Sequence, residues 1–389
     1  MAGRGPAALF LVLTTLVFSQ AAPQEQNGWR LRPAGKQVPV DTLPIASALS
    51  PDGRYLLVLN AGYNPPSISV MDVAQQSEIS RIPVADAWLG LAISPKGDRV
   101  YAGGGSQAAV FEFNFAQGKL EAGRVFHVVD AAKRTHQDFI GDVALSPDGR
   151  LIYAADLYHD AVVVINPQSG MVIERFKTGR RPYRILFHPD GKSFFVTSWS
   201  DGSLGHYQTD AGALIESVRI GAHPTDILWR TGAPAQGEGE VPWTARLFVA
   251  AANTNNVYAV GISAGKQLRL IETINVAMTP RQPLGSTPSA LALNADGSRL
   301  YVVCSDSNAV AVVDVTGERS AVTGFIPTGG YPTAARALSG GKLAVLNGRG
   351  ATVSFVDALN EDSLREHSAT ALANSPYRDT LLDNVIAPS

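Results

Sequence analysis

The chain has 389 residues, a formal net charge of −2, and a composition of 45% hydrophobic and 17% charged residues. This is an ordinary globular composition with enough apolar side chains for a large core. The basic residues form no run or stripe, which argues against a nucleic-acid-binding protein. The single cysteine, Cys304, excludes an internal disulfide, and its place at the end of an expected strand favours a small buried side chain.

Residues 1–22 have the pattern of a secretory signal peptide. One arginine is followed by an apolar segment from Ala7 to Phe18 and then by small residues that end at Ala22. This segment is too short to cross a bilayer, and no later apolar run approaches about 18 residues. We therefore expect cleavage after Ala21 or Ala22 and a periplasmic or secreted protein without a membrane span. A retained N-terminal anchor is the alternative.

Residues 36–357 contain seven copies of one pattern. Each copy has an apolar run, a tight turn, and two further β-rich runs that are separated by a polar loop. The glycines of the turns recur at intervals of about 42 to 52 residues, with one double-length gap. They are Gly53, Gly97, Gly149, Gly191, Gly297 and Gly341. In the gap, the polar insertion Thr231–Pro242 replaces the turn of the fifth copy. The period predicts an all-β fold, a seven-bladed β-propeller with four-stranded antiparallel blades.

The two ends of the repeat region are expected to meet. Lys36–Val40 precedes the first complete copy, and the last copy stops after its third strand at Asp357. We expect Lys36–Val40 to supply the outer strand of the seventh blade, so that the N-terminal strand closes the ring and removes an exposed edge. Residues 358–389 form a C-terminal tail in which Asn360–Ala373 is a short helix candidate. We expect that deleting residues 360–389 changes the melting temperature of the propeller little.

Few catalytic motifs are present. Gly261–Gly265 matches the G-x-S-x-G nucleophile elbow, but that elbow needs a following helix, whereas Leu268–Glu272 has the pattern of a strand. A hairpin turn is therefore expected there. The sequence has no C-x-x-C-H, H-E-x-x-H or cysteine cluster. We accordingly expect no catalytic residue of a known motif and no cofactor.

Propeller geometry supplies the candidate ligand site. The loop that leads into each blade and the loop between its second and third strands gather at one mouth of the central channel, where ligands usually bind. Those loops contribute His136, Asp142, Asp156, His159, Arg181, Tyr183, Trp199, His223, Asp226, Tyr331 and Arg349, together with Tyr63 and Trp88. Such aromatic and charged residues suit a polar or anionic ligand, or a carbohydrate.

Two alternatives stay open within this set. Asp156 and His159, with His136 and Asp142 nearby, could hold a divalent metal through oxygen and imidazole ligands. Polar residues at a propeller rim also serve simply to solvate the channel. Likewise Arg181 and Arg184, beside Tyr183, either line the channel as salt bridges or bind an anion.

The repeat resembles the YVTN repeat of bacterial surface and periplasmic propellers over residues 36–357. The phrases Gly285–Leu293, Gly324–Ala334, Asn347–Gly350 and Ala373–Tyr377 are similar to the N-terminal propeller of bacterial two-part proteins. In those proteins the propeller precedes a phosphoesterase domain of the alkaline-phosphatase type. That family often has Trp where Gly330 stands and Asn where Cys304 stands. The metal ligands and nucleophile of the phosphoesterase domain have no counterpart in this sequence.

The sequence therefore favours an exported, non-catalytic propeller that acts as a ligand-binding or protein-interaction scaffold. The resemblance implies a partner phosphoesterase activity on another chain; a small polar ligand is the other expected partner. The alternative function is a lactonase-like or metal-dependent hydrolase with its site at the channel mouth.

Overall fold

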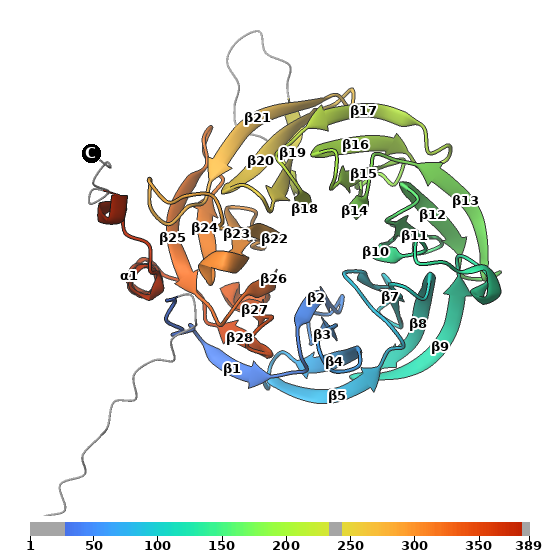
Figure 1. Cartoon of the computed structure of the whole chain (residues 1–389), viewed down its shortest axis with the longest axis horizontal. Coiled ribbons are helices and arrows are strands. Elements are labelled where there is room, and N and C mark those ends of the chain that lie inside the picture. The colour runs from blue at the N-terminus through green and yellow to red at the C-terminus, as the bar shows by residue number, and fades with distance from the viewer. Residues whose placement is uncertain (1–27, 233–242, 383–389) are drawn as a thin grey trace, which may run out of the picture.

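A computed structural model describes residues 28–232 and 243–382 of the chain. Within these residues, seven four-stranded antiparallel sheets are arranged as blades around a central axis (Figure 1). The predicted seven-bladed propeller is thus confirmed. The expected signal peptide, residues 1–22, and residues 233–242 of the polar insertion lie outside the described residues.

The strands of each blade follow one another from the channel outwards. Blade 1 has β2 (Pro44–Leu49), β3 (Tyr55–Asn60), β4 (Ser67–Asp72) and β5 (Ser77–Pro83). Blade 2 has β6 (Leu91–Ile93), β7 (Arg99–Gly103), β8 (Ala109–Ala116) and β9 (Lys119–His127). Blade 3 has β10 (Ile140–Leu145), β11 (Ile152–Asp156), β12 (Ala161–Asn166) and β13 (Met171–Lys177). Blade 4 has β14 (Pro182–Phe187), β15 (Ser193–Ser198), β16 (Ser203–Gln208) and β17 (Leu214–Arg219).

Blade 5 has β18 (Pro224–Thr231), β19 (Trp243–Ala251), β20 (Asn256–Ser263) and β21 (Leu268–Asn275). Blade 6 has β22 (Pro288–Leu293), β23 (Arg299–Cys304), β24 (Ala309–Asp314) and β25 (Ala321–Pro327). Blade 7 has β26 (Pro332–Ala337), β27 (Leu343–Asn347), β28 (Thr352–Val356) and β1 (Lys36–Pro39). Short 3-10 helices lie at Ala131–Lys133, Ser305–Ser307, Ser339–Gly341 and Asp379–Leu382.

The ring closes through the N-terminal strand, as the sequence predicts. β1 pairs antiparallel with β28, and Val38 lies opposite Val353. A polar contact secures the join, because the side-chain oxygen of Gln37 accepts hydrogen bonds from Ser354 Oγ (2.8 Å) and Asn347 Nδ2 (3.3 Å). The first and last segments of the propeller therefore share one sheet, which leaves the third strand of blade 7 without a free edge.

The core lies between neighbouring blades. The second and third strands of most blades are apolar and buried on both faces, because each sheet packs against the sheet on either side. In blade 1, for example, all six residues of β3 are buried. Such two-sided burial explains why these strands are continuous apolar runs in the sequence.

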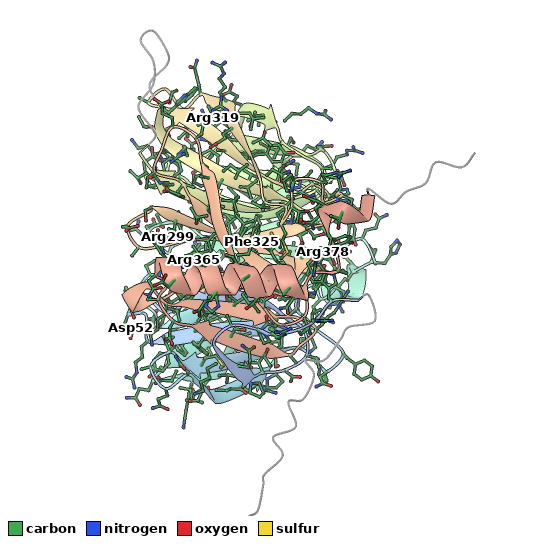
Figure 2. All side chains as sticks on the ribbon, turned by 90° about the vertical axis from the view of Figure 1, so that its left-hand side faces the viewer. Asp52, Arg299, Arg319, Phe325, Arg365 and Arg378 are labelled. Atoms are coloured by element: carbon green, nitrogen blue, oxygen red, sulfur yellow. The ribbon has the colours of Figure 1, made fainter. Side chains whose placement is uncertain are left out.

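The C-terminal tail packs on the outside of blade 6. Helix α1 (Glu361–Asn374) lies beside β25, and Figure 2 shows it along the outer side of the ring near Phe325. Leu364 and Ala371 of this helix are buried, and its Ser368 Oγ accepts a hydrogen bond from the backbone N–H of Phe325 (2.9 Å). A Cβ at Gly324 would lie 2.5 Å from Ser368 Oγ, so only glycine permits this approach. This packing argues against the expectation that the tail can be deleted at little cost to stability.

Two further sequence expectations are settled by the strands. β20 ends at Ser263 and β21 begins at Leu268, so the G-x-S-x-G segment is a hairpin turn. Cys304 is fully buried at the end of β23, and burial raises the pKa of its thiol to about 12. Among the described residues, no helix is long and apolar enough to span a membrane.

Candidate ligand site at the channel mouth

Five blades begin with the same backbone device. The residue before the first-strand proline has a positive φ, and its carbonyl accepts a hydrogen bond from the N–H that follows the second strand. Arg181 (φ 58°) accepts from Trp199 at 2.9 Å, and His223 (φ 58°) accepts from Ala252 at 2.9 Å. Non-glycine residues rarely adopt this conformation. The blade's own hydrogen bonds thus fix the side chains at these positions on the rim of the channel. The five residues are Leu43, Arg181, His223, Thr287 and Tyr331.

A cavity of about 770 Å³ opens at this mouth over blades 1 to 4. Its walls come from the β3–β4, β11–β12 and β15–β16 loops and from the segments that lead into blades 2, 3 and 4. Six aromatic side chains line it, namely Tyr63, Trp88, Phe139, Tyr158, Tyr183 and Trp199. Arg181, Asp86 and Asn64 are the main polar side chains in the wall. The size of the cavity and its mainly apolar lining, rich in aromatic side chains, are those of a small-molecule site.

The aromatic side chains contact one another along the wall. Trp88 meets Phe139 edge-on at 6.2 Å between ring centroids, and Phe139 meets Tyr158 at 5.9 Å. The guanidinium of Arg181 lies 4.5 Å from the centre of the Tyr158 ring. Aromatic pairs in these geometries, and a cation over a ring face, stabilise one another. The wall is therefore pre-organised before any ligand binds.

Trp199 forms the opposite end of this wall. Its indole stacks on the imidazole of His223, with 3.8 Å between ring centroids and 12° between the planes. His223 Nδ1 is buried without a hydrogen-bond partner among the described residues. His223 thus supports Trp199 from behind.

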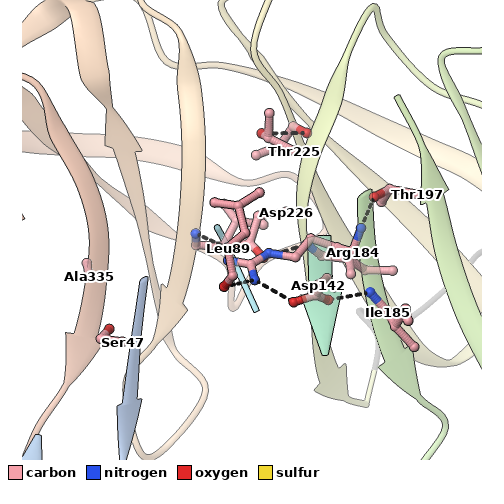
Figure 3. Close-up of polar contacts among 12 residues, drawn as sticks. Ser47, Leu89, Asp142, Arg184, Ile185, Thr197, Thr225, Asp226 and Ala335 are labelled. Atoms are coloured by element: carbon pink, nitrogen blue, oxygen red, sulfur yellow. Dashed lines mark hydrogen bonds and ion pairs between the residues drawn. The ribbon is translucent and has the colours of Figure 1, made fainter. Parts of the chain in front are cut away.

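An ion network links the first strands of neighbouring blades. Arg184 Nη1 lies 3.0 Å from Asp142 Oδ1, and its Nε lies 3.3 Å from Asp226 Oδ1 (Figure 3). The other oxygen of Asp142 accepts from the N–H of Ile185 (2.9 Å), and that of Asp226 from the N–H of Leu291 (2.8 Å). Although burial alone would lower the pKa of Arg184, the two carboxylates outweigh it and raise that pKa. The network joins blades 3 to 6, so Arg184 is a salt-bridged channel residue.

Tyr183 lies next to this network and also lines the cavity. Burial raises the pKa of its hydroxyl to about 12, although the nearby Arg184 opposes this. The hydroxyl is therefore protonated at neutral pH and can donate a hydrogen bond to a ligand.

Asp156 and His159, the residues that the sequence offered as metal ligands, are bound to other side chains. His159 Nδ1 lies 2.9 Å from Asp156 Oδ1 and its Nε2 lies 3.7 Å from Asp138. Arg175 donates to the second oxygen of Asp156, which is 1% exposed. In the part of the chain that the structure describes, no group of three or more His, Cys, Asp or Glu side chains is placed to hold a metal ion.

The structure divides the predicted site residues into four groups. Arg181, Tyr183 and Trp199 line the cavity with Tyr63 and Trp88, and His223 lies behind Trp199. Asp142 and Asp226 belong to the ion network, and Asp156 and His159 to the cluster with Arg175. His136 and Arg349 are exposed loop residues outside the cavity wall. Tyr331 is half-buried and also lies outside the wall, with the Arg349 guanidinium 4.9 Å from its ring centre.

Sequence reasoning missed Phe139 and Tyr158. Both lie in loops that the propeller geometry places at the channel mouth, directly beside Asp138 and His159. An aromatic residue at the rim cannot be told from a core residue by pattern alone, since both are apolar positions between strands.

Comparisons with known proteins support the fold. The family model described as "Lactonase, 7-bladed beta-propeller" matches residues 170–329, from the outer strand of blade 3 to the end of blade 6. No curated protein matches the chain. The chain is similar to the solved structure of hydrazine synthase of Kuenenia stuttgartiensis, with a TM-score of 0.65 and 17% identity over 83% of this chain and 98% of that chain. It is also similar to the Cps50 (Swd1) β-propeller domain of Myceliophteria thermophila, with a TM-score of 0.64 and 12% identity over 83% and 99%. At these identities the two structures show the fold alone.

Proposed function

We propose that this protein is a ligand-binding β-propeller and that its aromatic cavity binds a carbohydrate. The observation that carries the proposal is the gathering of six aromatic side chains around one cavity at the channel mouth. A sugar ring has C–H faces that pack on aromatic rings and hydroxyl edges that need polar partners. Tyrosine and tryptophan offer both an apolar ring and a polar tip, and Asn64 and the Tyr183 hydroxyl add polar groups.

The geometry favours binding from the outside. The cavity opens at the mouth of the channel, so a ligand would enter and leave there. Tyr63 stands at the rim with 98% of its surface exposed, although large aromatic side chains are usually at least partly covered. A bound ring would cover part of this side chain. The β3–β4 loop that carries it is anchored, because Asn64 donates to Asp41 Oδ1 at 2.7 Å and to Thr42 Oγ1 at 2.9 Å.

Intrinsic fluorescence tests this proposal, since Trp88 and Trp199 both lie in the wall. The probes are neutral and acidic oligosaccharides: cellotriose, chitotriose and trigalacturonate. We expect at least one of them to change the emission in a saturable way, and Trp199→Ala to weaken its binding about tenfold or more. Trp229→Ala is the control, because Trp229 lies in β18 outside the cavity. No saturable change with any probe, confirmed by calorimetry on the folded protein, would contradict the proposal.

Lactone hydrolysis is the second candidate, favoured by the family match over residues 170–329. The matched segment contains Arg181, Tyr183 and Trp199 of the cavity wall. A lactone is a ring that the same cavity would hold, and His223, whose Nδ1 has no partner among the described residues, would be the nearby base for activating water.

A pH-indicator assay with glucono-δ-lactone and γ-butyrolactone tests the hydrolase. Turnover above the spontaneous rate that is lost in His223→Gln would establish it. Hydrolysis at the spontaneous rate with both probes would leave the binding protein as the proposed function.

We further propose that the protein is exported and that it associates with a phosphoesterase on another chain. The first proposal rests on the pattern of residues 1–22, and the second on the phrases around Gly285–Leu293 and Gly324–Ala334. Mass spectrometry of the mature N-terminus after expression with the full leader tests export; an uncleaved cytoplasmic chain would contradict it. Isolation of the tagged protein from its native cells, assayed with p-nitrophenyl phosphate, tests the association; an eluate without phosphatase activity would contradict it.

A further inference from the structure

Three arginines lie within five residues at the start of blade 4, and the structure gives them different environments. Arg180 pairs with Asp201 at 2.7 Å, away from the cavity wall. Arg184 pairs with Asp142 and Asp226 in the channel. Among the described residues Arg181 has no ion pair, although its side chain is exposed and lines the cavity. It is therefore the arginine whose charge is open to a ligand.

The position of the Arg181 guanidinium is held from two sides. Its backbone N–H donates to Asp160 Oδ1 at 2.8 Å and its carbonyl accepts from Trp199 N–H at 2.9 Å, which fixes the residue in its positive-φ conformation. The guanidinium itself rests on the face of Tyr158. A stacked guanidinium keeps the N–H groups of its edge free to donate. The edge of Arg181 is thus presented as a planar donor in the cavity wall.

The carboxylate in the cavity wall does not neutralise Arg181. Asp86 Oδ2 accepts from the backbone N–H and the hydroxyl of Ser106, both at 2.7 Å, and its Oδ1 accepts from the N–H of Ala87 at 2.8 Å. Both oxygens of Asp86 are therefore already bonded to Ala87 and Ser106. The cavity wall therefore contains the Arg181 guanidinium, which forms no ion pair with a carboxylate among the described residues.

We propose that Arg181 selects a carboxylate on the bound ring, so that the ligand is an acidic sugar of the uronate class. This inference rests on the proposed function and names the ligand of that same site. A planar guanidinium edge matches a planar carboxylate with two parallel hydrogen bonds. A phosphate group, with its higher charge, would call for further cations or backbone donors, and Arg181 is the one basic side chain in this wall among the described residues.

Calorimetry with three matched probes tests this selection: trigalacturonate, its methyl ester, and galactose 6-phosphate. The ester keeps the rings and removes the negative charge. We expect trigalacturonate to bind at least about tenfold more tightly than its ester. We also expect this preference to weaken with added salt, because it is electrostatic. Arg181→Gln should abolish the preference, so that the variant binds the acid and the ester alike, whereas Arg180→Gln, the matched control, should keep the preference.

The outcomes separate the role of Arg181 from the presence of a carbohydrate site. Equal binding of acid and ester by the wild-type protein, with no effect of Arg181→Gln, would overturn the role of Arg181 and leave the carbohydrate site standing. Tighter binding of the sugar phosphate than of trigalacturonate would overturn the assignment to carboxylates. No binding of any probe would overturn the proposed function itself.

Discussion

The buried imidazole of His206 makes a specific prediction about acid stability. His206 lies in β16 with no exposed surface, stacked on Phe195 at 4.4 Å between ring centroids. Neither ring nitrogen makes a well-aligned hydrogen bond within the described residues. Burial lowers the pKa of this imidazole from 6.5 to about 4, and the Lys266 ammonium adds to the effect. His206 is therefore neutral in the folded protein at mildly acidic pH.

The size of the effect follows from proton linkage. A tenfold change in a protonation equilibrium corresponds to about 1.4 kcal/mol. Above pH 6.5 both folded and unfolded chains hold a neutral His206, and the full stability is present. As the pH falls below 6.5 the unfolded chain takes up a proton that the folded chain resists, so stability is lost until the pH falls below about 4. The loss amounts to about 2 kcal/mol at pH 5 and about 3 kcal/mol at its limit.

Urea unfolding of the wild type and of His206→Phe at pH 7.5 and pH 5 measures this contribution. Phenylalanine keeps the ring on Phe195 and cannot be protonated. We expect the free energy of unfolding of the variant, relative to that of the wild type, to rise by about 2 kcal/mol when the pH is lowered from 7.5 to 5. His136→Phe is the control, since His136 is exposed on the rim and should leave the pH dependence unchanged. A difference between wild type and His206→Phe that is the same at both pH values would refute the reasoning.

Three further predictions concern the parts that hold the ring together. Arg184→Met leaves the buried Asp142 and Asp226 without their shared cation and should cost about 3–5 kcal/mol in urea unfolding; an unchanged midpoint would show that the network does not stabilise the channel. Gln37→Ala removes the hydrogen-bond acceptor between β1 and β28. It should lower the free energy of unfolding by about 1–2 kcal/mol and speed proteolysis of the N-terminal strand. Equal proteolysis rates for variant and wild type would argue against a stabilising role of Gln37. Deleting residues 360–389 uncovers β25, so we expect the melting temperature to fall by about 4 °C or more; a shift within about one degree would instead support the expectation from sequence.

The sequence alone determined the architecture of this protein. Each blade needs an apolar run, a turn and two further strands in fixed order. These features recur along the chain, as in Thr287–Asp314, and only the fifth copy has a polar insertion in place of the turn. The same local logic predicted the closing strand, because Lys36–Val40 is the outer strand that the last copy lacks. It also predicted helix α1, whose Asn360 cap and acidic first turn are local signals.

Only the tertiary structure decided which rim residues form the cavity and which do not. Arg181 and Arg184 are three residues apart at the start of blade 4. Arg181 faces the cavity, whereas Arg184 is held between two carboxylates from blades 3 and 5. Trp199 reaches the site from a different strand pair, and Tyr158 from another blade. These neighbours come from segments far apart in the chain, so their contacts depend on how the blades are arranged around the axis. The propeller therefore follows from local pattern, whereas the site follows from packing between blades.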